Sequence, residues 1–143
     1  MSKIVIDTGN GGFQFPNGIE VDISLALQSV HIKDLVENFG GIDKLGGRID
    51  LKSDQDNDSI SRVFMYVDLA SKNPVVNDDT ERAKMAPWEI AFFDSISTKD
   101  LFNFILASNY LDIKTSLNAS CKRVANMIKG KTPEEIRKTF EVV

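Results

Sequence analysis

The stretch from Leu101 to Phe140 constrains the fold more than any other part of the chain. Its first ten residues carry apolar side chains on two sides of a helix. Leu101, Ile105 and Ser108 share one side, and Phe102, Leu106 and Tyr110 share the other. Because a helix that is apolar on both sides needs neighbours on both sides, this pattern predicts a central core helix.

Two further helices are predicted within the same stretch. The first has one apolar stripe at i, i+4, i+7 and i+11, formed by Leu117, Cys121, Val124 and Ile128, and Gly130 is placed to end it in a left-handed turn. The second begins with a strong start signal: Thr132 can cap, Pro133 suits the first helical position, and Glu135 can complete a capping box. Arg137 and Lys138 then oppose the negative end of that short helix.

The N-terminal half has a different pattern, in which short apolar runs alternate with turn residues. These runs predict two or three short strands among 4–6, 13–15 and 19–22, and a third or fourth at 48–51. Helical spacing predicts two short helices between 23 and 39 and a longer one that includes 60–67. Lys72 to Ala86 is polar and is expected to form an exposed loop, after which Trp88, Ile90, Phe92 and Phe93 gather aromatic and apolar area. The class expected is α+β, with a small N-terminal sheet flanked by helices and a helical second half.

Composition narrows the function classes. The chain of 143 residues suits one domain, and its net charge of −4 does not favour nucleic acid, which requires clustered Lys and Arg. The N-terminal residues lack the apolar run of a signal peptide, and no segment has the length of a membrane helix. The single cysteine cannot form an internal disulfide. These features predict a cytosolic or nuclear protein.

The residues that could carry chemistry are few. His31 is the only histidine, and Cys121 lies on the predicted apolar stripe, so a core cysteine is favoured over a catalytic Cys121–His31 pair. Asp54, Asp56 and Asp58 alternate like the start of a calcium loop, but Ser59 and Met65 stand where that loop needs Gly and Glu. We therefore predict no catalytic residue, no metal site and no cofactor.

Apolar side chains near the C-terminal end favour a binding role. Ile136 and Phe140 form an i, i+4 pair on a short helix, and a helix of that length must pack on something to be stable. It either folds back on the helix that precedes it or is completed by a partner's helices. The residues alone therefore indicate a partner-binding module.

Three segments carry a family resemblance. VDISLALQSVHIKDL (21–35), NYLDIK (109–114) and VANMIKGKTPEEIRKTF (124–140) resemble the S-phase-kinase-associated protein one family, the adaptor subunits of SCF-type ubiquitin ligases. The resemblance implies a BTB/POZ-like domain over 1–128, with a flexible loop at about 72–86, and a C-terminal helical extension over 129–143. That extension is shorter than is usual in the family, and the segments 9–18 and 40–68 diverge from the family pattern.

The resemblance also implies partners. The family's cullin-facing pair corresponds to Asn109 and Tyr110, and its F-box side corresponds to an apolar set made up of Leu117, Val124, Ile128, Ile136 and Phe140. The implied function is a non-catalytic adaptor that links F-box proteins to a cullin scaffold. The alternative is a BTB-type structural protein that forms a homodimer or a scaffold, and exposed apolar residues in the helix at 60–69 would favour it.

Overall fold

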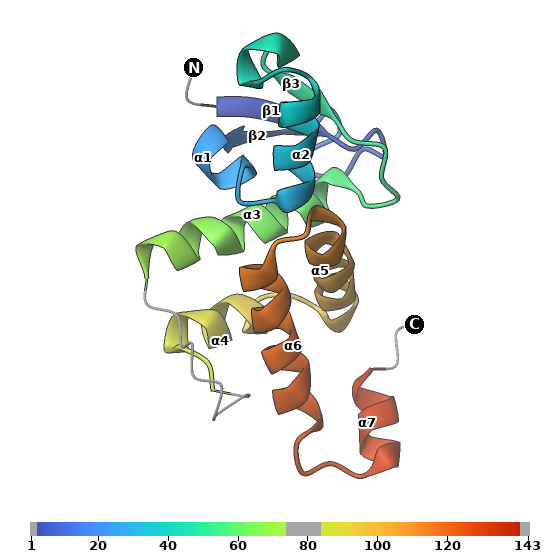
Figure 1. The fold of residues 1–143 in the computed structure, drawn as a ribbon. Coiled ribbons are helices and arrows are strands. Elements are labelled where there is room, and N and C mark those ends of the chain that lie inside the picture. The colour runs from blue at the N-terminus through green and yellow to red at the C-terminus, as the bar shows by residue number, and fades with distance from the viewer. Residues whose placement is uncertain (1–2, 74–83, 141–143) are drawn as a thin grey trace.

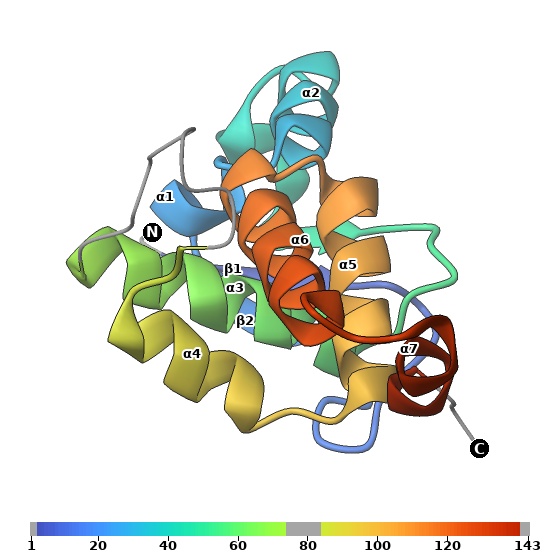
Figure 2. The same cartoon turned by 90° about the horizontal axis from the view of Figure 1, so that it is seen from below.

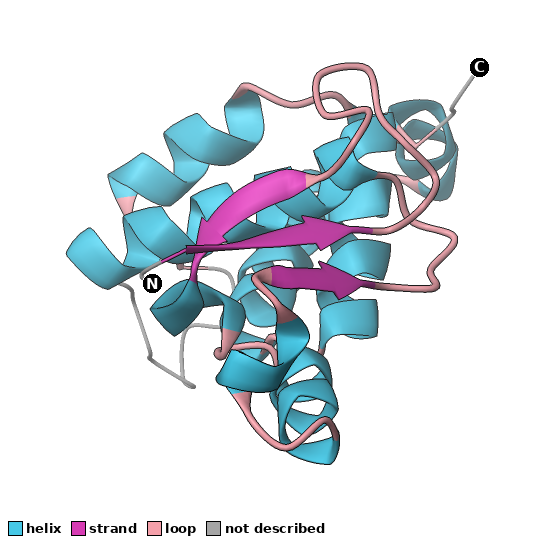
Figure 3. Cartoon of the chain, turned by 90° about the horizontal axis from the view of Figure 1, so that it is seen from above, coloured by secondary structure: helices cyan, strands magenta, loops and turns pink. Residues whose placement is uncertain are grey.

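A three-stranded sheet organises the N-terminal half of the computed structural model, which describes residues 3–73 and 84–140 (Figure 1). The strands are β1 (Lys3–Asp7), β2 (Ile19–Asp22) and β3 (Arg48–Asp50), in the order β2-β1-β3. β1 pairs with β2 antiparallel and with β3 parallel. Alternate residues of β1 and β2 are buried, as expected for a sheet with one face on a core (Figure 3).

Short helices fill the connection between β2 and β3. They are α1 (Ile23–Ala26), α2 (Val30–Asn38) and the 3₁₀ helix η1 (Ile42–Leu45). Ser29 caps α2 by accepting the N–H of Ile32, and Ile32 is fully buried. The predicted pair of helices between 23 and 39 and the strand near 48–51 are confirmed.

Of the two or three strands predicted up to Asp22, two form, and the segment 13–15 is not a strand. The N–H groups of Phe13, Gln14 and Phe15 donate to the carboxylate of Asp58, at 2.8 to 3.1 Å, instead of to a neighbouring strand. Gly12 allows this approach, because a Cβ at that position would lie 2.5 Å from Asp58 Oδ1. The acidic segment that resembled a calcium loop therefore anchors the β1–β2 loop through Asp58.

The core lies where α3 (Asn57–Lys72) crosses α5 (Thr98–Leu111), below the sheet (Figure 1). Tyr66 of α3 lies at the centre of an aromatic cluster whose other members are Trp88, Phe92, Phe93 and Phe104. Three of these come from α4 (Pro87–Asp94) and Phe104 comes from α5, so the predicted aromatic gathering is confirmed except that Ile90 is exposed. The Tyr66 hydroxyl donates to buried Glu89 at 2.7 Å.

α5 is the central helix that its pattern predicted, but only one of its sides is buried. The buried residues include Leu101, Phe104, Ala107 and Leu111, whereas Leu106 is 54% exposed. The prediction of two covered stripes is wrong, because α3 and α6 (Lys114–Ile128) together leave the Leu106 side of the helix open.

The chain ends in the hairpin of α6 and α7 (Pro133–Thr139), which Figure 1 shows leading away from the sheet and turning back. Gly130 makes the turn with φ 73°, as predicted. The prediction of a core cysteine is wrong, since Cys121 is exposed. The fully buried residues of α6 are instead the small ones, Ser116, Ala119 and Ser120, and Val124 and Met127 pack against the core while only partly buried.

The α+β class is confirmed. The predicted boundary at 128/129 coincides with the end of α6 at Ile128 but stays a prediction. Most of the loop predicted at 72–86, namely 74–83, lies outside the described residues, as do 141–143 of the predicted C-terminal extension.

Candidate protein-binding surfaces

The C-terminal end of α5 presents polar and apolar side chains together. Asn109 is exposed, and Tyr110 is half-buried at the edge of the core. Leu106 lies one helical turn before Tyr110 and is also exposed. This mixture of an amide, a phenol and an aliphatic side chain is typical of a protein interface. We call Leu106, Asn109 and Tyr110 the α5 surface.

Tyr110 is held by contacts from two other segments. His31 Nε2 of α2 lies 3.2 Å from the Tyr110 hydroxyl, and the two rings meet edge to face with centroids 4.8 Å apart. Burial raises the pKa of Tyr110, and a hydrogen bond with Ser53, in the loop after β3, acts in the opposite direction. The phenol therefore stays protonated near neutral pH and can exchange hydrogen bonds with these groups.

The end of α5 is fixed to α2 by bonds that do not involve Tyr110. The Ser29 hydroxyl donates to the carbonyl oxygen of Leu111, and Val30 N donates to Asp112 O at 3.3 Å. Asp112 is the only non-glycine residue with positive φ, at 53°, among residues 3–73 and 84–140. This left-handed turn ends α5 and directs the chain into α6 two residues later.

A second surface covers the far half of α6 and all of α7. No residue from Cys121 to Phe140 is buried, although this segment includes Val124, Ile128, Ile136 and Phe140. Leu117, closer to the start of α6, is half-buried. The predicted F-box set therefore lies together on one hairpin (Figure 2), only partly covered by the chain itself. We call these five residues the α6–α7 surface.

α7 is docked on its own domain, though lightly. It packs against α6, and the ring of Phe140 lies 5.5 Å from that of Phe102 in α5, centroid to centroid. Thr132 caps α7 by accepting the N–H of Glu135, and Pro133 occupies the first turn. The predicted start of this helix is confirmed. α7 folds back on its own domain, and none of its residues is fully buried.

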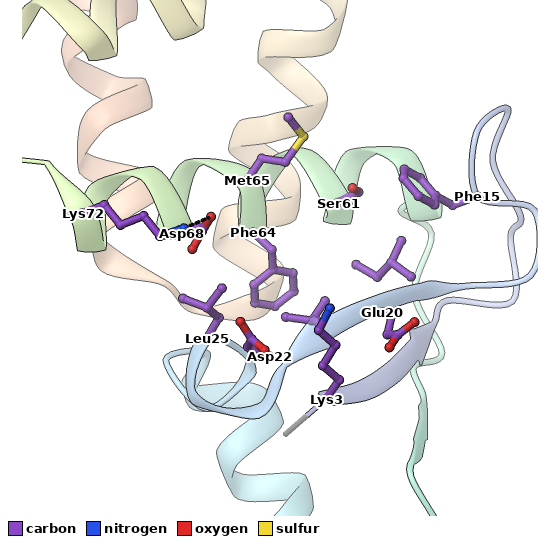
Figure 4. A pocket seen from close by; sticks show the side chains of 12 residues that line it. Lys3, Phe15, Glu20, Asp22, Leu25, Ser61, Phe64, Met65, Asp68 and Lys72 are labelled. Atoms are coloured by element: carbon purple, nitrogen blue, oxygen red, sulfur yellow. Dashed lines mark hydrogen bonds and ion pairs between the residues drawn. The ribbon is translucent and has the colours of Figure 1, made fainter. Parts of the chain in front are cut away.

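A groove of about 290 Å³ lies elsewhere, between β2 and α3 (Figure 4). Phe64, Met65 and Leu25 give it an apolar floor, and Lys72 pairs with Asp68 across one turn of α3 at its rim. Lys3, Glu20 and Asp22 add charges of both signs from the sheet. Neither His31 nor Cys121 lines this groove.

Over residues 3–73 and 84–140, the structure groups no set of histidine, cysteine and acidic side chains suited to a metal ion. Within the same ranges, no helix combines the length and the apolar character needed to span a bilayer. His31 and Cys121 do not form a pair, because His31 contacts Tyr110 on α5 while Cys121 lies exposed on α6.

The amino-acid sequence of this chain is similar to those of known proteins. The chain is 36% identical over 127 residues to the SCF ubiquitin ligase complex protein SKP1a of Dictyostelium discoideum, covering 86% of this chain and 76% of the relative. It is 37% identical over 130 residues to the E3 ubiquitin ligase complex SCF subunit sconC of Talaromyces stipitatus, covering 87% and 78%. This chain belongs to the Skp1 family. The model of the Skp1 family, dimerisation domain, matches residues 114–143, which include both helices of the α6–α7 surface.

The Skp1-family chain also has surface residues that the sequence pattern did not single out. Leu106 was expected to be covered, yet it extends the α5 surface. Phe102 contacts Phe140, and His31 contacts Tyr110 across 79 residues of sequence. The two pairs are tertiary contacts, so periodicity within one helix could not predict them.

Proposed function

We propose that this Skp1-family chain is a non-catalytic adaptor that links an F-box protein to a cullin scaffold in an SCF-type E3 ubiquitin ligase. Membership of the family supports the proposal, since the relatives named above are subunits of SCF ubiquitin ligase complexes. In this proposal Asn109 and Tyr110 contact the cullin. The α6–α7 surface, composed of Leu117, Val124, Ile128, Ile136 and Phe140, receives the apolar side of F-box helices.

One observation carries the bridging role: Ile128, Ile136 and Phe140 of the α6–α7 surface lie at the end of α6 away from the α5 surface, and only Leu117 lies near its start. The α5 surface is next to the start of α6, whereas Ile128 and α7 lie at its other end (Figure 1). A helix of 15 residues is about 22 Å long. Two partners can therefore bind at once without overlapping, which is what an adaptor requires.

The incomplete burial of the α6–α7 surface supports an F-box partner. Ile136 and Phe140 are half-buried, and Ile128 is 36% exposed. Each apolar side chain that a partner finishes burying contributes up to about 1.5–3 kcal/mol to association. Short helices with such a stripe bind apolar helices in a groove, as in other helix-in-groove complexes.

Self-association is the alternative that the experiment must distinguish. α3 exposes Met65 by 57% and Leu69 by 36%, whereas its other large apolar side chains are buried. Two such residues are ordinary for a monomer surface. A homodimer through α3 or through the α6–α7 surface would appear as a doubled mass.

The test is light scattering of the chain alone, with a cullin N-terminal domain, with an F-box segment, and with both. A monomer that forms a ternary complex is expected. Asn109→Lys combined with Tyr110→Lys should abolish only cullin binding. Ile136→Asp combined with Phe140→Asp should abolish only F-box binding. A stable homodimer that binds neither partner would refute the adaptor.

A further inference from the structure

His31 of α2 contacts both the ring and the hydroxyl of Tyr110. Its Nε2 lies 3.2 Å from the phenolic oxygen, and the rings meet at 61° with centroids 4.8 Å apart. Edge-to-face geometry at this distance is favourable in itself. The contact therefore constrains both the tilt of the tyrosine ring and the direction of its hydroxyl.

The fold does not need this contact to hold α2 against α5. Ser29 and Val30 already bond to the Leu111 and Asp112 carbonyl oxygens. Ile32 and Val36 bury the inner face of α2. His31 itself is half-buried and lies at the border between this packed face and solvent. A change at His31 should therefore alter Tyr110 more than it alters the fold.

We infer that His31 is a positioning residue for the cullin-binding surface, holding the Tyr110 ring and hydroxyl in the orientation that Tyr110 presents beside Asn109. This inference rests on the proposed function, because it assigns a role within the proposed cullin contact. It also extends the surface from α5 to α2, so that two helices together determine how Tyr110 meets a partner.

The physical benefit is preorganisation. A tyrosine at a helix end can turn about two side-chain torsions, and fixing it on binding costs free energy. The hydrogen bond between Tyr110 and His31 and the contact of the two rings fix it beforehand. The net value of one neutral hydrogen bond corresponds to a roughly three- to tenfold change in affinity.

A double-mutant cycle tests the inference on the full chain. His31→Phe keeps an aromatic ring but removes the hydrogen bond, and Tyr110→Phe removes the same bond together with the one to Ser53. His31→Phe should weaken cullin binding roughly three- to tenfold in the native background and have almost no effect in the Tyr110→Phe background. His31→Gln, whose amide can reach the phenol, should recover part of the affinity.

Three results would overturn the inference: no change in His31→Phe, an equal loss in both backgrounds, or a His31→Gln affinity no better than that of His31→Phe. F-box affinity and the thermal midpoint, measured on each variant, report whether the fold is intact.

The proposed function has its own test: if Asn109→Lys with Tyr110→Lys retains cullin binding, the assigned cullin surface fails. If that variant loses cullin binding while His31→Phe has no effect, only the role of His31 fails.

Discussion

At the scale of single residues, Asn57 connects the start of α3 to the sheet and to the β1–β2 loop. Its side-chain oxygen accepts the N–H of Thr8 at 2.9 Å, and its amide nitrogen donates to Asp7 and to the Phe15 carbonyl. The residue is fully buried, so each of these bonds replaces one that water would supply. An amide suits this position because the site requires a donor and an acceptor together.

Asn57→Asp should therefore destabilise the chain. The carboxylate would lose both donated hydrogen bonds and would face the Asp7 carboxylate, whose oxygen now lies 3.1 Å from the amide nitrogen. We expect a loss of about 2–3 kcal/mol in the free energy of unfolding, measured by urea denaturation. Asn17→Asp, an equivalent change at an exposed turn position, is the control and should have little effect.

The raised pKa of Tyr66 predicts that the stability of the chain depends on pH. Burial, followed by the hydrogen bond to Glu89, raises its pKa well above the ordinary value of 10.0. Below pH 10 the tyrosine is protonated in both folded and unfolded states, so its contribution to stability is fully present. Above pH 10 only the unfolded chain loses the proton, and stability falls as the pH rises.

The measurement for Tyr66 is the urea midpoint at pH 9 and at pH 11. The native chain should lose more stability between the two values than Tyr66→Phe does. Tyr66→Phe should also be less stable at pH 9, by about 1–3 kcal/mol, because it leaves buried Glu89 without one donor. Equal slopes in the two proteins would contradict the assigned role of this phenol.

At the scale of elements, α7 depends on its ends because it buries no side chain. Thr132 accepts from Glu135 N at 3.2 Å, and the acidic first turn and basic last turn both complement the helix dipole. Lys131 Nζ also donates to Thr139 across the helix, at 3.0 Å. Capping and hydrogen bonds at its ends therefore help to stabilise α7, whereas α5 is stabilised mainly by its buried side chains.

Thr132→Ala should weaken F-box binding more than it lowers the stability of the whole domain. Loss of an N-cap costs about 1 kcal/mol of helix stability, and the binding partner would have to supply it. We expect F-box affinity to fall by roughly fivefold in a titration, with the global unfolding midpoint almost unchanged. Thr115→Ala, in the first turn of α6 where Thr115 is exposed, is the control. An unchanged affinity in Thr132→Ala would exclude α7 from the F-box contact.

At the scale of the whole molecule, stability is unevenly distributed. The sheet, α3 and α5 share one continuous core, whereas no residue from Cys121 to Phe140 is buried. Arg123 and Asp94, 2.8 Å apart, pair α6 with the end of α4 near the point where burial stops. The molecule thus combines a packed body with an exposed hairpin.

Amide hydrogen exchange should reproduce this division. Amides of α7 and of α6 beyond Cys121 are expected to exchange much faster than those of α5, because few buried contacts oppose local opening. An F-box segment should slow exchange on the hairpin, and a cullin domain should slow it at the end of α5. Uniform protection of α5 and α7 in the free chain would contradict the packing described here.

The sequence by itself determined the local features of this protein. The Thr132–Pro133 start of α7, the Gly130 turn, the Ser97 cap of α5 and the alternating strand at 19–22 all arise from groups within a few residues of one another. Family membership was likewise contained in the sequence, and with it the expected roles of Asn109, Tyr110 and the α6–α7 residues.

Only the tertiary structure decided which faces are covered. Leu106 and Cys121 are exposed, and 13–15 is not a strand, because burial and hydrogen-bond partners come from segments far away in sequence. Asp58 takes the N–H groups that would have formed a strand, and the fully buried residues of α6 are its small ones, Ser116, Ala119 and Ser120. The His31–Tyr110 contact depends on the docking of α2 against α5, which no periodicity encodes.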